Sequence, residues 1–282
     1  MSNLNIFNVP NNVNQYNVTQ GDFLNAKLLD FTLSRFDSTI YGRTTLYGAT
    51  LGVDGTTRVI SPTSSTVNRA ITFPASVVTL RVASTSASDT SAGVGARTVL
   101  ITGLDSNYDS QTDTLSLNGT TPVNSTKQFL RITDIAVVTA GTSLFNVGNI
   151  YVSDSADTFT AGVPDNRLYF AMDIGENIGK TAVYTVPRGF NLVPERIHIN
   201  TTATGSNPIV VQIVNQNRKI SGNTYAIKDR FYISGFAELD LSPSPFISEK
   251  SDIFLNAYKT GGGANPSVHI KIFAILKKIQ KK

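Results

Sequence analysis

The sequence predicts an all-β protein with two β-sandwich domains, immunoglobulin-like or jelly-roll-like, and an extended N-terminal arm. Short runs of β-branched and aromatic residues recur at intervals of ~10–15 residues along most of the chain. Gly, Pro, Asn, Asp and Ser, the residues that favour turns, bound these runs. Helical periodicity is nearly absent, and its best candidate, DFLNAKLLDFTL, is short.

The length and composition exclude several classes of protein. The chain has 282 residues and a mass of 30.3 kDa, which suits two domains. It contains no cysteine, and this excludes disulfides, thiolate metal sites and cysteine catalysis. No stretch approaches the ~18 apolar residues of a membrane span, so we expect no membrane partner.

Changes in composition divide the chain into five segments. The first residues are rich in Asn and poor in charge, so they have little to bury and we expect an arm that becomes ordered on a neighbouring subunit. Its contacts would come from Phe7, Val9, Tyr16 and Val18. The expected segments are the arm (1–26), a β-sandwich (27–153), a linker (154–166), a jelly-roll-like sandwich (167–276) and a basic tail (277–282).

The strands that we expect fill both halves. In the first half they are Asp30–Phe36, Thr57–Ile60, Ser76–Ala83, Thr98–Leu104, Thr112–Leu117, Phe129–Thr139 and Ile150–Val152. In the second half they are Arg167–Met172, Ala182–Val186, Arg196–Asn200, Ile209–Val214, Phe231–Ile233, Ala237–Leu241, Asp252–Tyr258 and Val268–Leu276. The segment STSASDTSAGVG between two strands has no hydrophobic face, and we expect a mobile loop there.

The stretch Asp105-Ser-Asn107-Tyr-Asp109 begins like a calcium-binding loop. An EF-hand would need Gly at its sixth position and Glu at its twelfth, but Ser110 and Ser116 stand there. Strand-like sequences flank the stretch, which favours the loop of a β-hairpin. A cation site formed by the three residues together with Asp113 stays open as the alternative.

Residue patterns for catalysis are absent from the sequence. The only histidines, His198 and His269, lie within apolar strands and should point away from the apolar face. Neither a nucleophile elbow nor a phosphate-binding loop occurs, and Glu238 and Asp240 share one strand face rather than facing each other across a cleft. We therefore expect no enzyme and no cofactor.

The positive charge is partly local to the C-terminus. The net charge is +4, and Lys277, Lys278, Lys281 and Lys282 belong to the last six residues. This tail is either a solvated end or a contact for packaged nucleic acid or an acidic neighbour. The body of the chain lacks the basic stripe of a nucleic-acid-binding protein, so nucleic acid is otherwise not an expected partner.

One segment resembles virion structural proteins of marine tailed phages and related viruses. It runs ARTVLITGLDSNYDSQTDTLSLNGTTPVNSTKQFLRITDIAVVTAGT. The matching positions are Gly103, Leu104, Asp105, Asn107, Tyr108, Leu117, Asn118, Gly119, Thr120, Thr121, Val123, Leu130, Arg131 and Ile132. The stretch PFISEKSDIFLNAYKTGGGANPSVHIKIFAIL also looks like the closing strands of phage appendage and capsid-surface domains. The resemblance implies backbone roles, including a two-residue Asn118-Gly119 hairpin turn.

The function that these observations lead us to expect is a non-enzymatic structural role in a virion. The protein would assemble on the capsid surface, as a decoration or fibre-base component, or in the tail. Closed symmetric assembly favours a homotrimer, with other virion proteins as further partners. Two alternatives stay open: a receptor- or glycan-binding module of a viral fibre, against which the absence of Trp counts, and a jelly-roll capsid shell protein.

Overall fold

The computed structural model describes residues 41–50, 52–56, 58–59, 71–179, 181–217, 225–241 and 246–279. Within these ranges the chain is all-β, which confirms the all-β part of the prediction. The strands are β1 (Tyr41–Thr50), β2 (Arg58–Val59), β3 (Val78–Ser84), β4 (Ala96–Leu104), β5 (Ser110–Ser116), β6 (Val123–Phe129), β7 (Arg131–Ala140), β8 (Ile150–Asp154), β9 (Phe159–Thr160), β10 (Val163–Pro164), β11 (Phe170–Met172), β12 (Val183–Thr185), β13 (Phe190–Thr201), β14 (Ile209–Asn217), β15 (Tyr225–Ile233), β16 (Phe236–Asp240), β17 (Ser251–Lys259) and β18 (Val268–Lys278). Among these residues no helix could cross a membrane.

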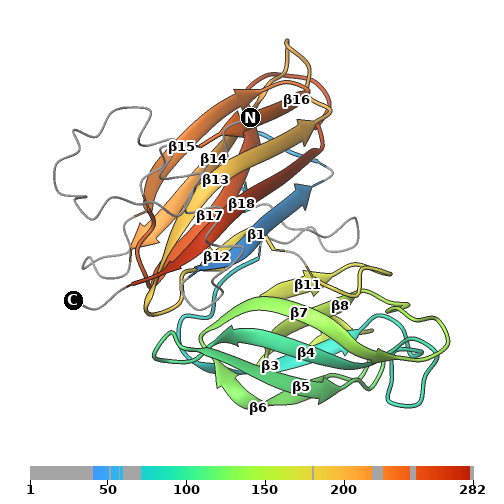
Figure 1. Cartoon of the computed structure of the whole chain (residues 1–282). Helices are drawn as coiled ribbons and strands as arrows, with labels where there is room; N and C mark the ends of the chain where they lie inside the picture. The colour runs from blue at the N-terminus through green and yellow to red at the C-terminus, as the bar shows by residue number, and fades with distance from the viewer. Residues whose placement is uncertain are drawn as a thin grey trace, which may run out of the picture.

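The first sandwich contains strands β3 to β11. One sheet has the order β11-β8-β3-β6, the other has the order β5-β4-β7, and β9 and β10 form a short hairpin beside them (Figure 1). Alternate residues of the strands point between the two sheets, as the period of a strand requires. Leu80, Val82, Val99, Ile101 and Phe129 fill that space and are almost completely buried.

The second sandwich has the strand order of a jelly roll. Its two sheets run β1-β18-β13-β16 and β12-β17-β14-β15, and β2 lies alongside β17. The first strand of the eight pairs with the last, and the second pairs with the seventh. This order places two Greek keys in one sandwich. Leu46, Ile197, Ile213, Leu255 and Ile270 belong to the apolar core between the sheets.

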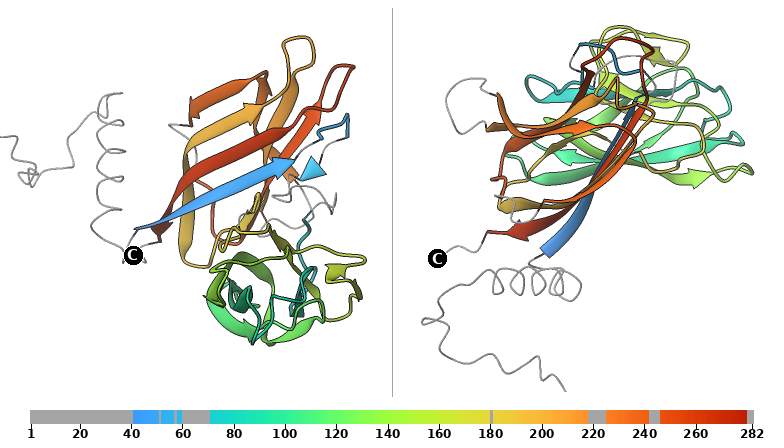
Figure 2. Two further views of the ribbon diagram at one scale, coloured as in Figure 1. Left: turned by 90° about the vertical axis from the view of Figure 1, so that its right-hand side faces the viewer. Right: turned by 90° about the horizontal axis from the view of Figure 1, so that it is seen from above.

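A third apolar cluster joins the two sandwiches face to face. β8 and β17 are buried along their apolar residues on both faces. Ile150 and Val152 face the core of the first sandwich, whereas Tyr151 packs with Val214 and Phe254 of the second. Figure 2 shows the two sandwiches in contact from two further directions. We call this contact between the two sandwiches the junction, and the third cluster makes the apolar packing continuous across it.

The two sandwiches do not divide the chain as the sequence predicted, and the difference lies at three places. The sequence predicts no strand at residues 41–50 and places them in the first domain. In the structure these residues form β1, which pairs along its whole length with β18 of the second sandwich. β11 pairs with β8 and so belongs to the first sandwich. The expected linker (154–166) contains β9, β10 and the buried Asp157. A strand's partner is decided by tertiary packing, which local sequence does not encode.

The expected Asn118-Gly119 hairpin is wrong. The strands on either side of it, β5 and β6, lie in different sheets, so the turn is a corner between sheets. Gly119 has a φ of +61°, which glycine adopts without strain. A Cβ at this position would also lie 3.0 Å from the Cα of Ala87. The glycine is therefore needed for the close approach of two loops.

The loop between β3 and β4, expected to be mobile, is built around the buried carboxylate of Asp89. That carboxylate accepts hydrogen bonds from the Ser84 hydroxyl at 2.6 Å and the Ala96 N–H at 2.7 Å. It also accepts the backbone N–H groups of Val147 at 3.0 Å and Gly148 at 2.8 Å. One side chain thus joins the β3–β4 loop to the β7–β8 loop.

Candidate functional site

The junction between the sandwiches contains a fully buried ion pair. Arg131, at the start of β7, and Asp252, on β17, both have side chains with no exposed surface. The Nε and Nη2 of Arg131 donate to the two carboxylate oxygens of Asp252, at 3.0 and 2.9 Å. This two-pronged geometry is the strongest arrangement for such a pair.

The remaining polar groups of this pair are also satisfied. Nη1 of Arg131 donates to the carbonyl oxygens of Pro74 and Leu130, at 3.1 and 2.6 Å. The Thr185 hydroxyl donates to Asp252 at 2.5 Å, and the ring of Phe73 lies 4.5 Å from the guanidinium carbon. A buried pair offsets its desolvation cost only when its other polar groups are bonded in this way.

The stretch from Asp105 to Asp109 forms the hairpin loop between β4 and β5, as the sequence predicted. One carboxylate oxygen of Asp105 accepts the backbone N–H groups of Asn107 and Asp109, at 2.8 and 2.9 Å. Tyr108 has a φ of +66°, a left-handed conformation that closes the loop. The carboxylate of Asp105 is therefore bound to the loop's own backbone.

The same loop contacts the second sandwich, a role that the sequence did not indicate. The Arg188 guanidinium pairs with the carboxylate of Asp109. The backbone N–H of Arg188 donates to the Tyr108 carbonyl at 2.9 Å, and the ammonium group of Lys250 lies 5.4 Å from the Tyr108 ring. The loop is thus a second, exposed contact between the sandwiches.

Asp113, the fourth suggested cation ligand, has separate partners. It lies on β5 and accepts the N–H groups of Thr126 and Lys127 of β6, at 2.6 and 3.1 Å. It also accepts the Thr126 hydroxyl at 2.9 Å. Within the part of the chain that the structure describes, no three His, Asp or Glu side chains gather as a metal site would need.

Gly103, in the segment that resembles phage proteins, is packed against the start of β7. A Cβ there would lie 2.2 Å from the carbonyl oxygen of Arg131 and 2.7 Å from the ring of Phe129. Only glycine permits this close approach between β4 and β7. Gly103 therefore sets the position of the Arg131 backbone, whereas Tyr108 and Arg131 themselves contact the second sandwich.

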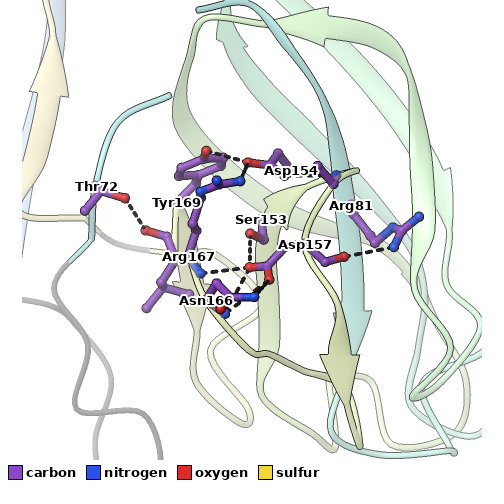
Figure 3. Close-up of polar contacts among 10 residues, drawn as sticks. Thr72, Arg81, Ser153, Asp154, Asp157, Asn166, Arg167 and Tyr169 are labelled. Atoms are coloured by element: carbon purple, nitrogen blue, oxygen red, sulfur yellow. Dashed lines mark hydrogen bonds and ion pairs between the residues drawn. The ribbon is translucent and has the colours of Figure 1, made fainter. Parts of the chain in front are cut away.

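A groove of about 640 Å³ lies beside the junction, on the first sandwich. Its walls come from residues 72–73 and 75–79, Gln128, residues 154–156 at the end of β8, and Arg167 and Tyr169 before β11. Figure 3 shows the polar contacts at its edge: the Asp154 carboxylate accepts hydrogen bonds from the Arg167 Nη1 and the Tyr169 hydroxyl, both at 2.7 Å. About half of the Arg167 side chain stays exposed to the groove's surroundings.

Tyr169 and Arg167 keep their protons near neutral pH. Burial, followed by the hydrogen bond to Asp154, raises the pKa of the Tyr169 phenol well above its usual value. The hydrogen bond to Asp154 likewise raises the pKa of Arg167. Because neither group titrates near neutral pH, this arrangement is suited to hydrogen-bonding a polar ligand rather than to proton transfer.

Asp157 holds the loop beneath this pair. Burial raises the pKa of its carboxyl, but hydrogen bonds from the backbone of Arg167, the side chain and backbone of Asn166 and the Ser153 hydroxyl outweigh burial and lower it. The Ser153 hydroxyl and the Arg167 N–H each lie 2.8 Å from the carboxylate (Figure 3). Asp157 is therefore a structural anchor for the loop that carries Arg167.

Both histidines lie on the outer face of the jelly roll, as strand alternation predicted. His269 is exposed, and its Nδ1 is 3.1 Å from the Tyr47 hydroxyl. Nε2 of His198 is 3.4 Å from Glu238, and its ring meets Phe273 edge to face at 5.0 Å. These contacts are those of side chains on a sheet surface.

The expected arm and tail lie largely outside the described residues. This holds for Phe7, Val9, Tyr16 and Val18 of the arm and for Lys281 and Lys282 of the tail. Lys277 and Lys278 are described, and they end β18 opposite Asn191 and Phe190. The structure therefore leaves the roles of both ends as predictions.

Sequence analysis named Arg131 only as a position of the phage-like segment and did not indicate the roles of the junction and groove residues. Arg131 and Asp252 do carry a local signal, because each is a charge inside an apolar strand, in FLRITDI and SDIFL. Such a charge is either exposed or paired in the interior, and sequence alone does not pair residues 121 positions apart. Asp154 and Tyr169 carry no distinguishing pattern.

Comparison with protein-family models and with curated proteins finds no match. Comparison with solved structures finds weak similarity to infectious bursal disease virus. The structure of its Gt strain is 10% identical, covers 86% of this chain and 78% of that chain, and has a TM-score of 0.18. The crystal structure of the VP2 subviral particle of the same virus is 9% identical in sequence, covers 87% of this chain and 78% of that chain, and has a TM-score of 0.18. Structural overlap this low supports no argument about function.

Proposed function

We propose that this chain is a non-enzymatic structural protein of a virus particle and that it acts by self-assembly. The observation that carries the proposal is the strand order of the second sandwich, β1-β18-β13-β16 against β12-β17-β14-β15. Jelly rolls of this kind occur in viral capsid proteins, and also in lectins and cupins. Among the alternatives, this order favours a shell protein over a tail component.

The position of the first sandwich supports the same proposal. It is inserted between β1 and β12, the first two strands of the jelly roll, and is fixed to it by the buried Arg131–Asp252 pair. Fold alone does not decide function. The resemblance of the inserted segment to phage virion proteins adds weight, because its Tyr108 and Arg131 both contact the jelly roll.

Light scattering of the purified full chain tests the proposal. We expect a stable oligomer, and a mass of three times 30.3 kDa would give the trimer. A chain that lacks residues 2–20 should stay folded but assemble less well, because the arm is expected to bind a neighbour. A monomer at all accessible concentrations, with or without those residues, would overturn self-assembly.

The groove favours glycan binding as a second candidate function. Its lining includes Thr72, Thr79, Gln128 and the Asp154–Arg167 pair, and such groups bond sugar hydroxyls. A glycan array probed with the wild-type chain and with Arg167→Ala tests this. We expect binding that the substitution weakens, while Arg196→Ala, on the other sandwich, leaves it unchanged. An array without signal would remove this candidate.

A further inference from the structure

The first sandwich carries an unusual concentration of exposed apolar side chains at one end. Eleven large apolar residues are exposed in the described part of the chain, and six of them belong to this region. We call these six the apolar end patch: Val94, Val138, Leu144, Phe145, Ile174 and Ile178, each between 42% and 76% exposed. Exposed apolar side chains that gather in one region are typical of an interaction site.

Backbone hydrogen bonds bring the segments of the patch together. The Ser143 N–H donates to the Val94 carbonyl at 2.9 Å, which joins the β3–β4 loop to the β7–β8 loop. The side-chain Nδ2 of Asn177 donates to the Leu144 carbonyl at 2.9 Å, and the Val137 N–H donates to the backbone carbonyl of Asn177 at 2.7 Å. Figure 1 shows these loops at an end of the first sandwich.

A buried side chain holds the patch in shape. Asn146 has no exposed surface. Its amide donates to the carbonyls of Gly148 and Asp173, at 2.8 and 2.7 Å, and its carbonyl accepts the Asn177 N–H at 3.2 Å. The loops that carry the apolar residues are thus pre-organised, which lowers the entropy cost of binding a partner.

Leu144 ends a tight turn, in which its N–H donates to the Gly141 carbonyl at 3.1 Å, and it does so in an unfavourable conformation. Its φ is +64°, a left-handed value that is unfavourable for leucine and better tolerated by Asn or Asp. Its side chain is also 76% exposed, so it gains little burial in return. A strained, exposed leucine is therefore a candidate for contact with another molecule.

We propose that the apolar end patch binds the same patch of a second copy of this chain, around a rotation axis of the assembly. Residues 91–95 and 141–149 carry no charge, so the part of the patch formed by Val94, Leu144 and Phe145 can meet its counterpart without burying an unpaired charge. The acidic residues Asp173 and Glu176 lie beside Ile174 and Ile178, so we place the axis near Leu144. Side chains nearest a rotation axis meet their own counterparts, which requires a self-complementary surface. The inference rests on the proposed self-assembly and names one surface that makes it.

The absence of cysteine from the chain permits a direct test. In the full chain, Leu144→Cys should give a disulfide-linked dimer under mild oxidation, because the two thiols meet near the axis. Thr114→Cys, at an exposed position on β5, is the matched control and should cross-link at least tenfold less. Equal cross-linking of the two variants would overturn the proposal.

A second variant separates assembly from folding. Leu144→Asn suits the left-handed backbone, so the chain should fold as well as the wild type, yet its dissociation constant should rise at least tenfold. Phe236→Asn, 66% exposed on β16, should leave the mass unchanged. If the wild type assembles but neither Leu144 variant behaves as expected, this inference fails and self-assembly stands. If the wild type is monomeric, both fail.

Cysteine cross-linking would also show whether another segment binds the patch. The uncharged residues 2–20 are the strongest competitor, because they also contain apolar side chains. A mixture of the Val9→Cys and Leu144→Cys chains would then give the mixed disulfide in preference to the Leu144 homodimer. That result would overturn contact between patches and assign the patch to the arm.

Discussion

The buried pair of Arg131 and Asp252 makes the junction sensitive to a single substitution. Arg131→Met would leave the Asp252 carboxylate buried with only part of its hydrogen bonds. Removing one partner of such a pair costs about 3–5 kcal/mol, because an uncompensated charge remains inside the protein. We expect the free energy of unfolding, measured by urea denaturation, to fall by this amount.

Two further variants separate the charge effect from the loss of contacts. Arg131→Met combined with Asp252→Val leaves no charge in the junction, so it should cost less than Arg131→Met alone. Arg196→Met breaks the exposed pair with Glu238, at 2.7 Å, and should change stability by less than about 1 kcal/mol. An equal loss in the single and double variants would show that packing, not charge, dominates.

Because two tyrosines are buried, we expect the free energy of unfolding to fall at alkaline pH. Burial is the main cause that raises the pKa of both Tyr169 and Tyr184 far above the usual value. In the unfolded chain these phenols lose their protons near pH 10, whereas in the folded chain they keep them. The folded state then binds more protons, so stability is complete below about pH 10 and falls as the pH rises above it.

Urea midpoints measured from neutral pH to about pH 11 check this prediction. Tyr184→Phe should make the decline shallower, because one of the two shifted phenols is gone. Tyr232→Phe, at a side chain 65% exposed, should leave the slope unchanged. A decline with the same slope in all three proteins would mean that other groups cause it.

At the scale of elements, Asp89 decides the structure of two loops. Asp89→Ala would leave the Ser84 hydroxyl and three backbone N–H groups without their acceptor. We expect a loss of about 3 kcal/mol or more, together with faster proteolysis within residues 85–95 and 141–149. Asp105→Ala, in an exposed loop, should cost about 1 kcal/mol at most. Unchanged cleavage in Asp89→Ala would show that the loops are held by other contacts.

The strands that the sequence predicted best are those with regular apolar alternation. β18 and β4 show this, since Val268, Ile270 and Ile272 or Val99 and Ile101 recur at every second position. β6, with the sequence VNSTKQF, was missed because it is a polar edge strand with one face exposed. β1, YGRTTLYGAT, was missed because its glycines and threonines resemble a loop.

The sites were less predictable than the strands, for a physical reason. The Asp105–Asp109 loop was recognised because the chemistry of a turn is local. Arg131 and Asp252, in contrast, are 121 residues apart, and Asp154 and Tyr169 come together only when the segment around Asp157 folds back. Contacts of this kind are made by topology, and a single sequence does not display topology.

At the scale of the whole molecule, the junction decides whether the sandwiches behave as one body. Inter-domain contacts that are small and polar permit independent motion. Here the contact combines an apolar cluster containing Tyr151, Val214 and Phe254 with a buried ion pair. The inserted sandwich is therefore a fixed projection of the jelly roll.

This coupling predicts a single cooperative thermal transition. Two core variants, one in each sandwich, provide the test by calorimetry: Ile101→Ala in the first and Ile270→Ala in the second. Each should lower stability by about 2–5 kcal/mol, and each should shift the same single peak downwards. If the sandwiches unfolded independently, each variant would move one of two peaks and leave the other in place. One shared peak would mean that damage to either core is transmitted through the junction, which contains both the apolar cluster and the Arg131–Asp252 pair.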